Sequence, residues 1–467
     1  MRPNVNRSVN VFNPATGEYI KTIDSNWFND PRDETLTIKT MHLSWLQTTL
    51  QERIQLMQNF GKQLETRKDK LANLLTDEVG KPLWQSVNEI NGAISRVKWM
   101  TDNAEKFLSD EWVTHSDNMK ERISYDPIGI VAVISAWNYP YLVGVNAFVA
   151  ALLAGNTVLY KPSEYAMLTG MEIDRLMYYS GVGNNAFKLI LGGSNVGEQL
   201  TSMPLDGYCF TGSYNSGLKV RKAVSDRLIP VQLEMGGKDP VYVMDDIQDI
   251  PKVAAAVADG AFYNNGQSCC AIERVYVHEA IYDEFLKSFL EVVKSWKLGY
   301  PKDENVYFGA ITRKEQISIL LAQVEDALKY GATLQLGGRK IAHAGNYFEP
   351  TVLTEVNHNM KVMMEESFGP IIGIMKVKDD STAIKLMNDT EYGLTASVFS
   401  TSQERAESVL SKVNSGTAYW NCCDRVAPGL PWSGRKNSGF GGATLSHLGL
   451  RQFTKPRGWQ LRSVEAL

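Results

Sequence analysis

The 467-residue sequence has few of the features that mark secreted, metal-binding or nucleic-acid-binding proteins. It contains only five cysteines, with no CxxC pair, and six scattered histidines, with no HExxH motif. Neither a disulfide framework nor a zinc site is predicted from such a pattern. The formal net charge of −4 provides no electrostatic footprint for nucleic acid. We therefore expect a reduced protein with no intrinsic metal and no nucleic-acid partner.

No segment of the chain resembles a membrane span or a secretory signal. The most apolar stretch, residues 143–155, is shorter than the roughly 20 residues that a helix needs to cross a bilayer. Residues 1–7 are polar and lack an apolar h-region, so a signal peptide is not expected. With no membrane partner and no disulfides, the chain is predicted to be cytoplasmic.

What the sequence does contain is an alternation of short apolar runs with helical patterns. Apolar residues recur at helical spacing through most of residues 33–115. From residue 128, β-rich runs alternate with helix candidates, and a second such block extends from about Asp239 to about Gly439. This alternation predicts parallel sheets covered on both faces. Strand candidates of the first block lie at 128–134, 157–160, 187–191, 206–210 and 230–233.

Ligands of parallel sheets bind at the carboxyl ends of the strands, and we expect the polar motifs of this chain just after its strands. Glu234 directly follows a strand candidate and precedes two glycines. It is either a surface carboxylate or a general base that the close backbone brings near a reacting group. Asn138 follows the first strand of the block, where it either forms a turn or donates its amide to a developing oxyanion.

Cys269 follows a Gly-Gln turn in the segment Gly-Gln-Ser-Cys at 266–269. A lone cysteine is most often a small buried hydrophobic residue. A cysteine in a cleft whose pKa is lowered by local dipoles is instead a strong nucleophile. The adjacent Cys270 leaves the choice between the two thiols open on position alone.

Two glycine-bearing turns precede helix candidates, one at 192–197 and one containing Gly212 and Ser213. Free backbone N–H groups at such a helix start favour a phosphate, although tight-turn packing explains the glycines equally well. Lys161 and Glu164 follow the second strand, either as a solvated pair or as hydrogen-bonding partners of a ribose.

Together these motifs resemble the aldehyde dehydrogenase superfamily over nearly the whole chain. They occur in the family's order as Trp-Asn-Tyr-Pro (137–140), Lys-Pro-Ser-Glu (161–164), Phe-Thr-Gly-Ser (210–213), Glu-Met-Gly-Gly-Lys (234–238), Gly-Gln-Ser-Cys (266–269) and Glu-Glu-Ser-Phe-Gly-Pro (365–370). Ala136 departs from the proline that many relatives have before Trp-Asn, and this should alter only the end of the strand.

The resemblance implies oxidation of an aldehyde to the carboxylic acid by a Cys269 thiohemiacetal and thioester. The family pattern selects Cys269 over its neighbour, assigns the oxyanion to the Asn138 amide and the Cys269 backbone N–H, and makes Glu234 the activator of the hydrolytic water. The implied cofactor is NAD, because the Glu164 carboxylate would repel the 2′-phosphate that NADP carries. NADP is the alternative cofactor. The residues implied at the cofactor are Trp137, Lys161, Ser163, Glu164, Gly212, Ser213, Glu366 and Phe368.

The resemblance also completes the expected fold, which is α/β. A Rossmann-like parallel-sheet cofactor domain would comprise residues 1–108 and 128–235, and a second α/β catalytic domain residues 236–439. A small β oligomerisation element would comprise residues 109–127, which suggest a hairpin, and 440–467, with a strand near 457–463. Relatives commonly assemble as dimers or dimers of dimers, so a homodimer or homotetramer is expected.

The substrate is predicted only as a small-molecule aldehyde. Tyr139, Tyr263 and Trp432 stand where betaine aldehyde dehydrogenases are similar, with aromatic rings that cage a trimethylammonium group. The fourth cage position corresponds to Asn146, so a generic apolar tunnel for neutral aldehydes competes with a betaine-aldehyde or aminoaldehyde specificity. A non-catalytic structural relative and a cofactor-free esterase are the rival functions, and the presence of Cys269 and the nucleotide motifs argues against both.

Overall fold

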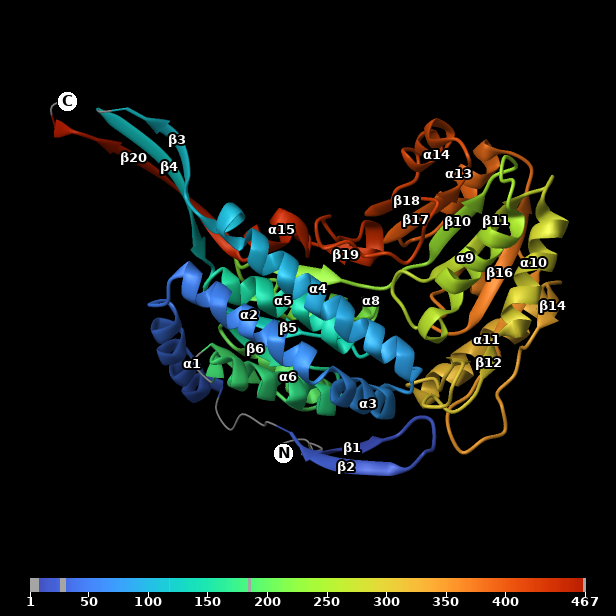
Figure 1. Ribbon diagram of the computed structural model, residues 1–467, viewed down its shortest axis with the longest axis horizontal. Helices are drawn as coiled ribbons and strands as arrows, with labels where there is room; N and C mark the ends of the chain where they lie inside the picture. Colours follow the sequence, from blue (N-terminus) through green and yellow to red (C-terminus); the bar gives the residue numbers. More distant parts are fainter. Residues whose placement is uncertain (1–7, 26–30, 117, 184–185, 465–467) are drawn as a thin grey trace.

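The computed structural model describes residues 8–25, 31–116, 118–183 and 186–464, with the side chains of all of these except residues 31–36. Residues 1–7, where no signal peptide was expected, lie outside the described residues. Two α/β bodies lie side by side, and a long three-stranded sheet projects from the first of them (Figure 1).

The first body contains a six-stranded sheet in the order β19-β9-β8-β5-β6-β7. Its strands are β5 (Ile130–Ile134), β6 (Thr157–Lys161), β7 (Phe187–Leu189), β8 (Gly207–Thr211), β9 (Val231–Glu234) and β19 (Gly439–Phe440). Its helices are α1 (Pro31–Trp45), α2 (Leu50–Thr66), α3 (Lys68–Val79), α4 (Leu83–Leu108), α5 (Pro140–Leu153), α6 (Met167–Ser180), α7 (Ser194–Ser202), α8 (Tyr214–Ala223) and α15 (Ser446–Arg451). The predicted alternation of strands and helices is confirmed.

The second body contains a seven-stranded sheet in the order β14-β15-β16-β11-β10-β17-β18. Its strands are β10 (Asp239–Val243), β11 (Ile272–His278), β14 (Thr333–Leu336), β15 (Thr351–Thr354), β16 (Ile371–Val377), β17 (Thr395–Phe399) and β18 (Thr417–Trp420), with a small pair, β12 (Lys297–Leu298) and β13 (Val306–Phe308), beside it. Its helices are α9 (Ile250–Phe262), α10 (Tyr282–Ser295), α11 (Lys314–Lys329), α12 (Lys361–Met364), α13 (Asp380–Asn388) and α14 (Gln403–Leu410).

Helices cover both faces of the second sheet because its central strands are apolar on both sides. Along β10, Val241 and Val243 pack with residues of α9 and α10, whereas Tyr242 packs with residues of α11 and α14. Successive side chains of a strand point to opposite faces, which explains the division into two cores. Within the described residues, no helix is long and apolar enough to span a membrane.

The sheets are not wholly parallel, so that expectation is wrong at two edges. β19 pairs antiparallel with β9, because the chain returns from the second body to add an edge strand to the first. β14 pairs antiparallel with β15 at the outer edge of the second sheet. The N-terminal hairpin of β1 (Ser8–Phe12) and β2 (Tyr19–Asp24) was not predicted either.

The projecting sheet has the order β20-β4-β3 and is antiparallel throughout. It consists of β3 (Glu111–His115), β4 (Met119–Pro127) and β20 (Thr454–Arg462), which confirms the predicted hairpin and the last strand. Leu445, Leu450 and Phe453, just before β20, are buried in the core of the first body. The C-terminal segment thus anchors the projection to that body.

The polar motifs do not all follow strands. The expectation is correct for Asn138 and Glu234, but it is wrong for Cys269, which precedes β11, and for Glu366, which precedes β16. The backbone N–H of Gly237 donates to Glu366 Oε1 at 3.1 Å. The amino end of the second sheet therefore meets the carboxyl end of the first, and the motifs converge from two opposite strand ends.

Candidate active site

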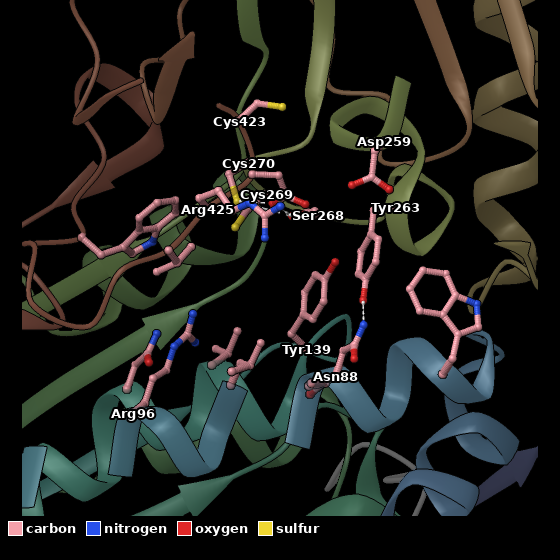
Figure 2. Close-up of a pocket in the computed structure, with 18 residues that line it drawn as sticks. Asn88, Arg96, Tyr139, Asp259, Tyr263, Ser268, Cys269, Cys270, Cys423 and Arg425 are labelled. Atoms are coloured by element: carbon pink, nitrogen blue, oxygen red, sulfur yellow. Dashed lines mark hydrogen bonds between the residues drawn. The ribbon is translucent and has the colours of Figure 1, made fainter. Parts of the chain in front are cut away.

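A cavity of about 560 Å³ opens between the two bodies. Helix α4 and the start of α5 form one wall, and the segment around Cys269 with residues 423–432 forms the other (Figure 2). Aromatic side chains line much of it, and they belong to Trp84, Tyr139, Tyr263 and Trp432. The three aromatic residues singled out in the sequence as pocket walls are thus all present in one cavity.

The chain reaches Cys269 through a strained turn. Asn264, Asn265 and Gly266 have φ values of 53°, 57° and 67°, and each non-glycine residue in this region is destabilising by about 1–3 kcal/mol. Asn264 Nδ2 donates to the Asn138 carbonyl at 3.1 Å, and Asn265 Nδ2 donates to the Ala310 carbonyl at 3.1 Å. These buried hydrogen bonds hold a conformation that the local sequence would not adopt alone.

The two adjacent cysteines differ in their surroundings. Cys269 is half-buried at the cavity, whereas Cys270 is buried and its thiol donates to Asp424 Oδ1 at 3.0 Å. A hydrogen bond with Cys269, then burial and the Asp424 charge, raise the pKa of Cys270 well above its usual range. Cys270 therefore remains a thiol at neutral pH, and Cys269 is the better placed of the two for attack on a ligand.

Glu234 is buried at the end of β9 with only one of its carboxylate oxygens bonded. Oε1 accepts from Gln232 Nε2 at 2.9 Å, whereas Oε2 is buried with no partner among the described residues. Burial, and then the negative charge at Cys269, raise the pKa of Glu234 well above its usual range. The influence of Cys269 on this pKa places the two groups within electrostatic reach of each other.

Asn138 lies beside the Cys269 segment. Its Nδ2 donates to the Gln267 carbonyl at 3.0 Å, which leaves the second N–H of the amide free, because a side-chain amide has two. The backbone N–H of Cys269 has no acceptor among the described residues. Asn138, bonded two residues before Cys269, and Cys269 itself thus each have an unused N–H donor.

A buried ion pair fixes this region to helix α4. Lys81 Nζ binds Glu89 Oε2 and donates to the Asn138 carbonyl at 2.7 Å, and Glu89 Oε1 accepts from the Tyr141 backbone N–H at 2.9 Å. The same ammonium lies 4.1 Å from the centre of the Tyr139 ring. Tyr139 therefore already has a cation on one face of its ring.

A second buried ion pair fixes the turn that contains Glu366 and Phe368. Lys238 Nζ is 2.7 Å from Glu273 Oε2, and Glu273 accepts from the backbone N–H of Ser367 and of Phe368 at 2.8 and 2.9 Å. Phe368 has a φ of 47°. Burial, and then the Glu273 charge, raise the pKa of Glu366 to about 8.

The aromatic ring of Phe368 connects this turn to the first body. Its centre lies 5.4 Å from that of Trp137, edge to face, and Trp137 also contacts Tyr165 with ring centres 6.4 Å apart. The motifs at 137 and 366–368 are therefore in contact, although 228 residues lie between Trp137 and Glu366 in the sequence.

The remaining nucleotide-motif residues lie around the carboxyl ends of β6 and β8. Lys161 is buried, and its ammonium donates to the Pro162 carbonyl at 3.1 Å. Ser163 Oγ donates to Glu164 Oε2 at 3.4 Å, and Glu164 lines a second cavity of about 520 Å³. Ser213 precedes α8, and its hydroxyl donates to the Ser216 hydroxyl and does not cap a backbone N–H group at the start of the helix. Gly212, beside it, packs against Phe210, whose ring leaves no room for a side chain there.

Comparison with known proteins decides the family. The sequence model of the aldehyde dehydrogenase family matches residues 2–458. This chain belongs to the aldehyde dehydrogenase family.

Curated relatives and solved structures support the assignment along the chain. Aminoaldehyde dehydrogenase 2 of Solanum lycopersicum is 32% identical, over 92% of this chain and 87% of the relative. A succinate-semialdehyde dehydrogenase [NADP(+)] of Deinococcus radiodurans is 31% identical, over 95% of this chain and 93% of the relative. The crystal structure of an NADP-dependent enzyme from E. coli superposes with a TM-score of 0.94 at 28% identity and covers 98% of this chain and 96% of its own.

The chain is thus an oxidoreductase that acts on an aldehyde with NAD or NADP, and the α/β fold predicted for it is confirmed. The aldehyde dehydrogenases among its solved neighbours include both NAD- and NADP-dependent enzymes.

Several residues of the site were not found by sequence reasoning. Lys81, Glu89 and Asp424 lie in no motif that was recognised, and only the fold shows that Lys81 and Glu89 are buried and that Glu89 and Asp424 line the cavity. Arg96 had a detectable signal, because it falls between Ala93 and Met100 on the apolar face of α4, where a charge is unexpected.

Replacement of Glu273 by glutamine should destabilise the enzyme strongly. The substitution leaves the buried Lys238 ammonium without its counter-charge and turns an N–H₂ group toward two backbone donors, so the free energy of unfolding should fall by about 3–5 kcal/mol. Urea denaturation measures it. Glu349→Gln, which breaks an exposed pair with Arg339, is the matched control and should change stability by at most about 1 kcal/mol. Equal stability of the two variants would contradict this account of the turn.

Proposed function

We propose that Cys269 carries the aldehyde oxidation as its nucleophile, with Asn138 and Glu234 as its partners. The observation that supports this most is the contrast between the two thiols that line the cavity: Cys269 is the more exposed, whereas Cys270 is buried and its thiol donates to Asp424. A thiolate attacks the aldehyde carbon, and the carbonyl oxygen becomes an oxyanion. The free N–H of Asn138 and the backbone N–H of Cys269 are the donors available to stabilise it.

When bound, the oxidised nicotinamide supplies the acceptor for the hydride that the thiohemiacetal carbon loses, and a thioester then remains on Cys269. Glu234 takes a proton from water, which adds to the thioester carbonyl. Collapse of this adduct breaks the carbon–sulfur bond, releases the carboxylic acid and restores the thiolate.

The electrostatics of Glu234 suit this order of events. The negative charge at Cys269 raises the pKa of Glu234 in the free enzyme. Formation of the neutral thioester removes that charge, so the pKa of Glu234 falls at the step in which its carboxylate is needed as a base. Its unpartnered Oε2 has a lone pair available for the proton.

The residues around the first sheet fit a dinucleotide. Lys161 uses one of its three donors on the Pro162 carbonyl, so two are available to ribose hydroxyls. Ser213 leaves the first N–H groups of α8 uncapped, which favours a phosphate next to Gly212 and Ser213. We assign the adenosine ribose to Lys161, Ser163 and Glu164, with a preference for NAD because of the Glu164 carboxylate. We assign the nicotinamide end to Trp137, Glu366 and Phe368.

A betaine-aldehyde or aminoaldehyde specificity remains the narrower alternative. Tyr139, Tyr263 and Trp432 all line the cavity, as that hypothesis requires, and Asp259 lies beside Tyr263. Against it, Asn146 stands in place of a fourth aromatic residue, and Lys81 occupies one face of the Tyr139 ring. The non-catalytic and esterase alternatives have no observation in their favour.

Substitution of each cysteine by serine tests the identity of the nucleophile. Cys269→Ser should reduce NADH formation to background, because a hydroxyl is a far weaker nucleophile at neutral pH, while NAD still quenches the tryptophan fluorescence. Cys270→Ser, the matched control, should keep at least a tenth of the wild-type kcat/KM. The assignment is wrong if the two variants behave in the opposite way.

Removal of the carboxylate at position 234 tests the deacylation step. Glu234→Gln should form about one NADH per site in a rapid burst and then turn over 10²–10⁴-fold more slowly, as expected for loss of a general base. Because the pKa of Glu234 is raised, the steady-state rate of the wild type should increase with pH as this carboxylate loses its proton, and this dependence should disappear in the variant. Stopped-flow absorbance at 340 nm measures both, and undiminished turnover in the variant would refute the role.

We further propose that the chain is a cytoplasmic homodimer or homotetramer, assembled through the projecting sheet. Trp112 and Val113 on the edge strand β3 are 50% and 64% exposed, and Leu461 on the opposite edge strand β20 is 43% exposed, and exposed apolar residues on sheet edges are typical of an interface. Light scattering should give a multiple of 52.1 kDa, and Val113→Asp should shift the mass toward the monomer. A monomeric wild type would contradict the proposal. The cytoplasmic assignment is supported by five free cysteines.

A further inference from the structure

An arginine side chain with no partner points into the cavity beside the nucleophile. Arg96, on α4, is 7% exposed and lines the cavity, and Figure 2 shows its guanidinium directed from the helix toward the space below Cys269. Among the described residues, no carboxylate or hydrogen-bond acceptor is within bonding distance of it, and its nitrogens remain accessible to the cavity.

Burial of a cation of this kind carries a large desolvation penalty unless a partner of opposite charge compensates it. Burial lowers the pKa of Arg96 to about 10, whereas the charges of Cys270, Glu89 and Cys269 act in the opposite direction. Arg96 therefore remains protonated at neutral pH, and it lies within electrostatic reach of the reacting thiol. A guanidinium has five N–H donors, and attraction to the thiolate alone would leave most of them without a hydrogen bond.

The acidic residues of the cavity are already engaged or lie elsewhere. Glu89 is bonded to Lys81 and to a backbone N–H, and Asp424 accepts from the Ser268 hydroxyl and the Cys270 thiol. Asp259 accepts from the Tyr307 hydroxyl at 2.7 Å, and Figure 2 shows it beside Tyr263, away from Arg96. None of these carboxylates is bonded to Arg96, although the charge of Glu89 acts on its pKa.

Two further polar groups favour an anion at this end. Asn146, on the neighbouring helix α5, is 9% exposed and lines the same cavity, and its amide N–H₂ group, which makes no hydrogen bond among the described residues, is available to donate to an anion. Arg425 lines the cavity from the opposite wall, and Figure 2 shows its guanidinium directed into the space above Arg96. Planar guanidinium groups bind carboxylates through paired hydrogen bonds.

We propose that Arg96, with Asn146 and Arg425 beside it, binds a carboxylate on the substrate, so that the enzyme oxidises ω-carboxyaldehydes, the semialdehydes of short dicarboxylic acids. This inference rests on the proposed function, because it orients the substrate's other end toward Cys269. It selects a negatively charged aldehyde over the neutral and cationic aldehydes considered above. The aromatic walls then contact the methylene chain between the two ends.

The test compares kcat/KM of the holoenzyme for succinic and glutaric semialdehyde with that for pentanal, which is neutral, and 4-aminobutanal, which is cationic. One of the semialdehydes should be the best substrate of the wild type. Arg96→Met should lower kcat/KM for it by about 10- to 100-fold, the loss expected for a charge-assisted hydrogen bond, mainly through KM. The value for pentanal should stay within about threefold, and Arg96→Lys should restore part of the loss.

A measurement without turnover complements the kinetics. Succinate or glutarate, added to the enzyme without cofactor, should raise the melting temperature of the wild type but not that of Arg96→Met. Lys98→Met, which removes an exposed positive charge from the same helix, is the matched control and should behave as the wild type in both experiments.

A preference of the wild type for 4-aminobutanal or pentanal would overturn the proposal. So would an Arg96→Met variant that loses activity equally toward pentanal and the semialdehyde, because that result indicates a structural role. Absence of activity toward all four aldehydes, with the dicarboxylate effect on melting intact, would instead count against the proposed function.

Discussion

The buried pair of Lys81 and Glu89 is the interaction on which the geometry of the site depends. The ammonium of Lys81 binds the carbonyl of Asn138, and the carboxylate of Glu89 binds the first backbone N–H groups of α5 through Tyr141. Asn264 donates to the same Asn138 carbonyl. One ion pair therefore connects helix α4, the strand-end turn of the first body and the strained turn before Cys269. Removal of either charge would leave the other buried and unpaired, which is strongly destabilising.

That connection explains how two bodies form a single site. Cys269 and Glu366 come from the amino end of one sheet, and Asn138 and Glu234 come from the carboxyl end of the other. Neither body alone has both the proposed nucleophile and the proposed base. The left-handed residues Asn264, Asn265 and Phe368 lie where the bodies meet, and each is held by hydrogen bonds to buried groups. Strain at such positions persists because the surrounding structure determines it.

The order of strands and helices was predictable because it depends on local periodicity, which a sequence displays directly. Cys269 and Glu234 could be proposed from the sequence, because each stands in a short motif with glycines beside it. Lys81 and Glu89 were not, since their roles arise from contacts between segments far apart in the chain, whereas Arg96 was marked only by its place on the apolar face of α4. Lys81 precedes a proline and has the sequence context of a surface turn, and only the fold shows that it is 0% exposed. The antiparallel strand β19 was missed for the same reason, because two residues that return from another body have no periodicity of their own.

The arrangement of charge around Cys269 follows from what must happen there. A thiolate, a carboxylate that becomes a base and an incoming carbonyl that becomes an oxyanion would together concentrate negative charge in one cavity. These negative charges lie on different groups, and Glu234 is not charged at the same step as Cys269. Asp424 is bonded to Ser268 and Cys270 rather than directed at the substrate, and the pKa of Glu234 stays raised while Cys269 is charged. Arg96 adds a positive charge at the edge of this group, and among the described residues it has no hydrogen-bonded partner. A negatively charged substrate bound there would displace none of the hydrogen bonds that hold Asn138 and the turn before Cys269.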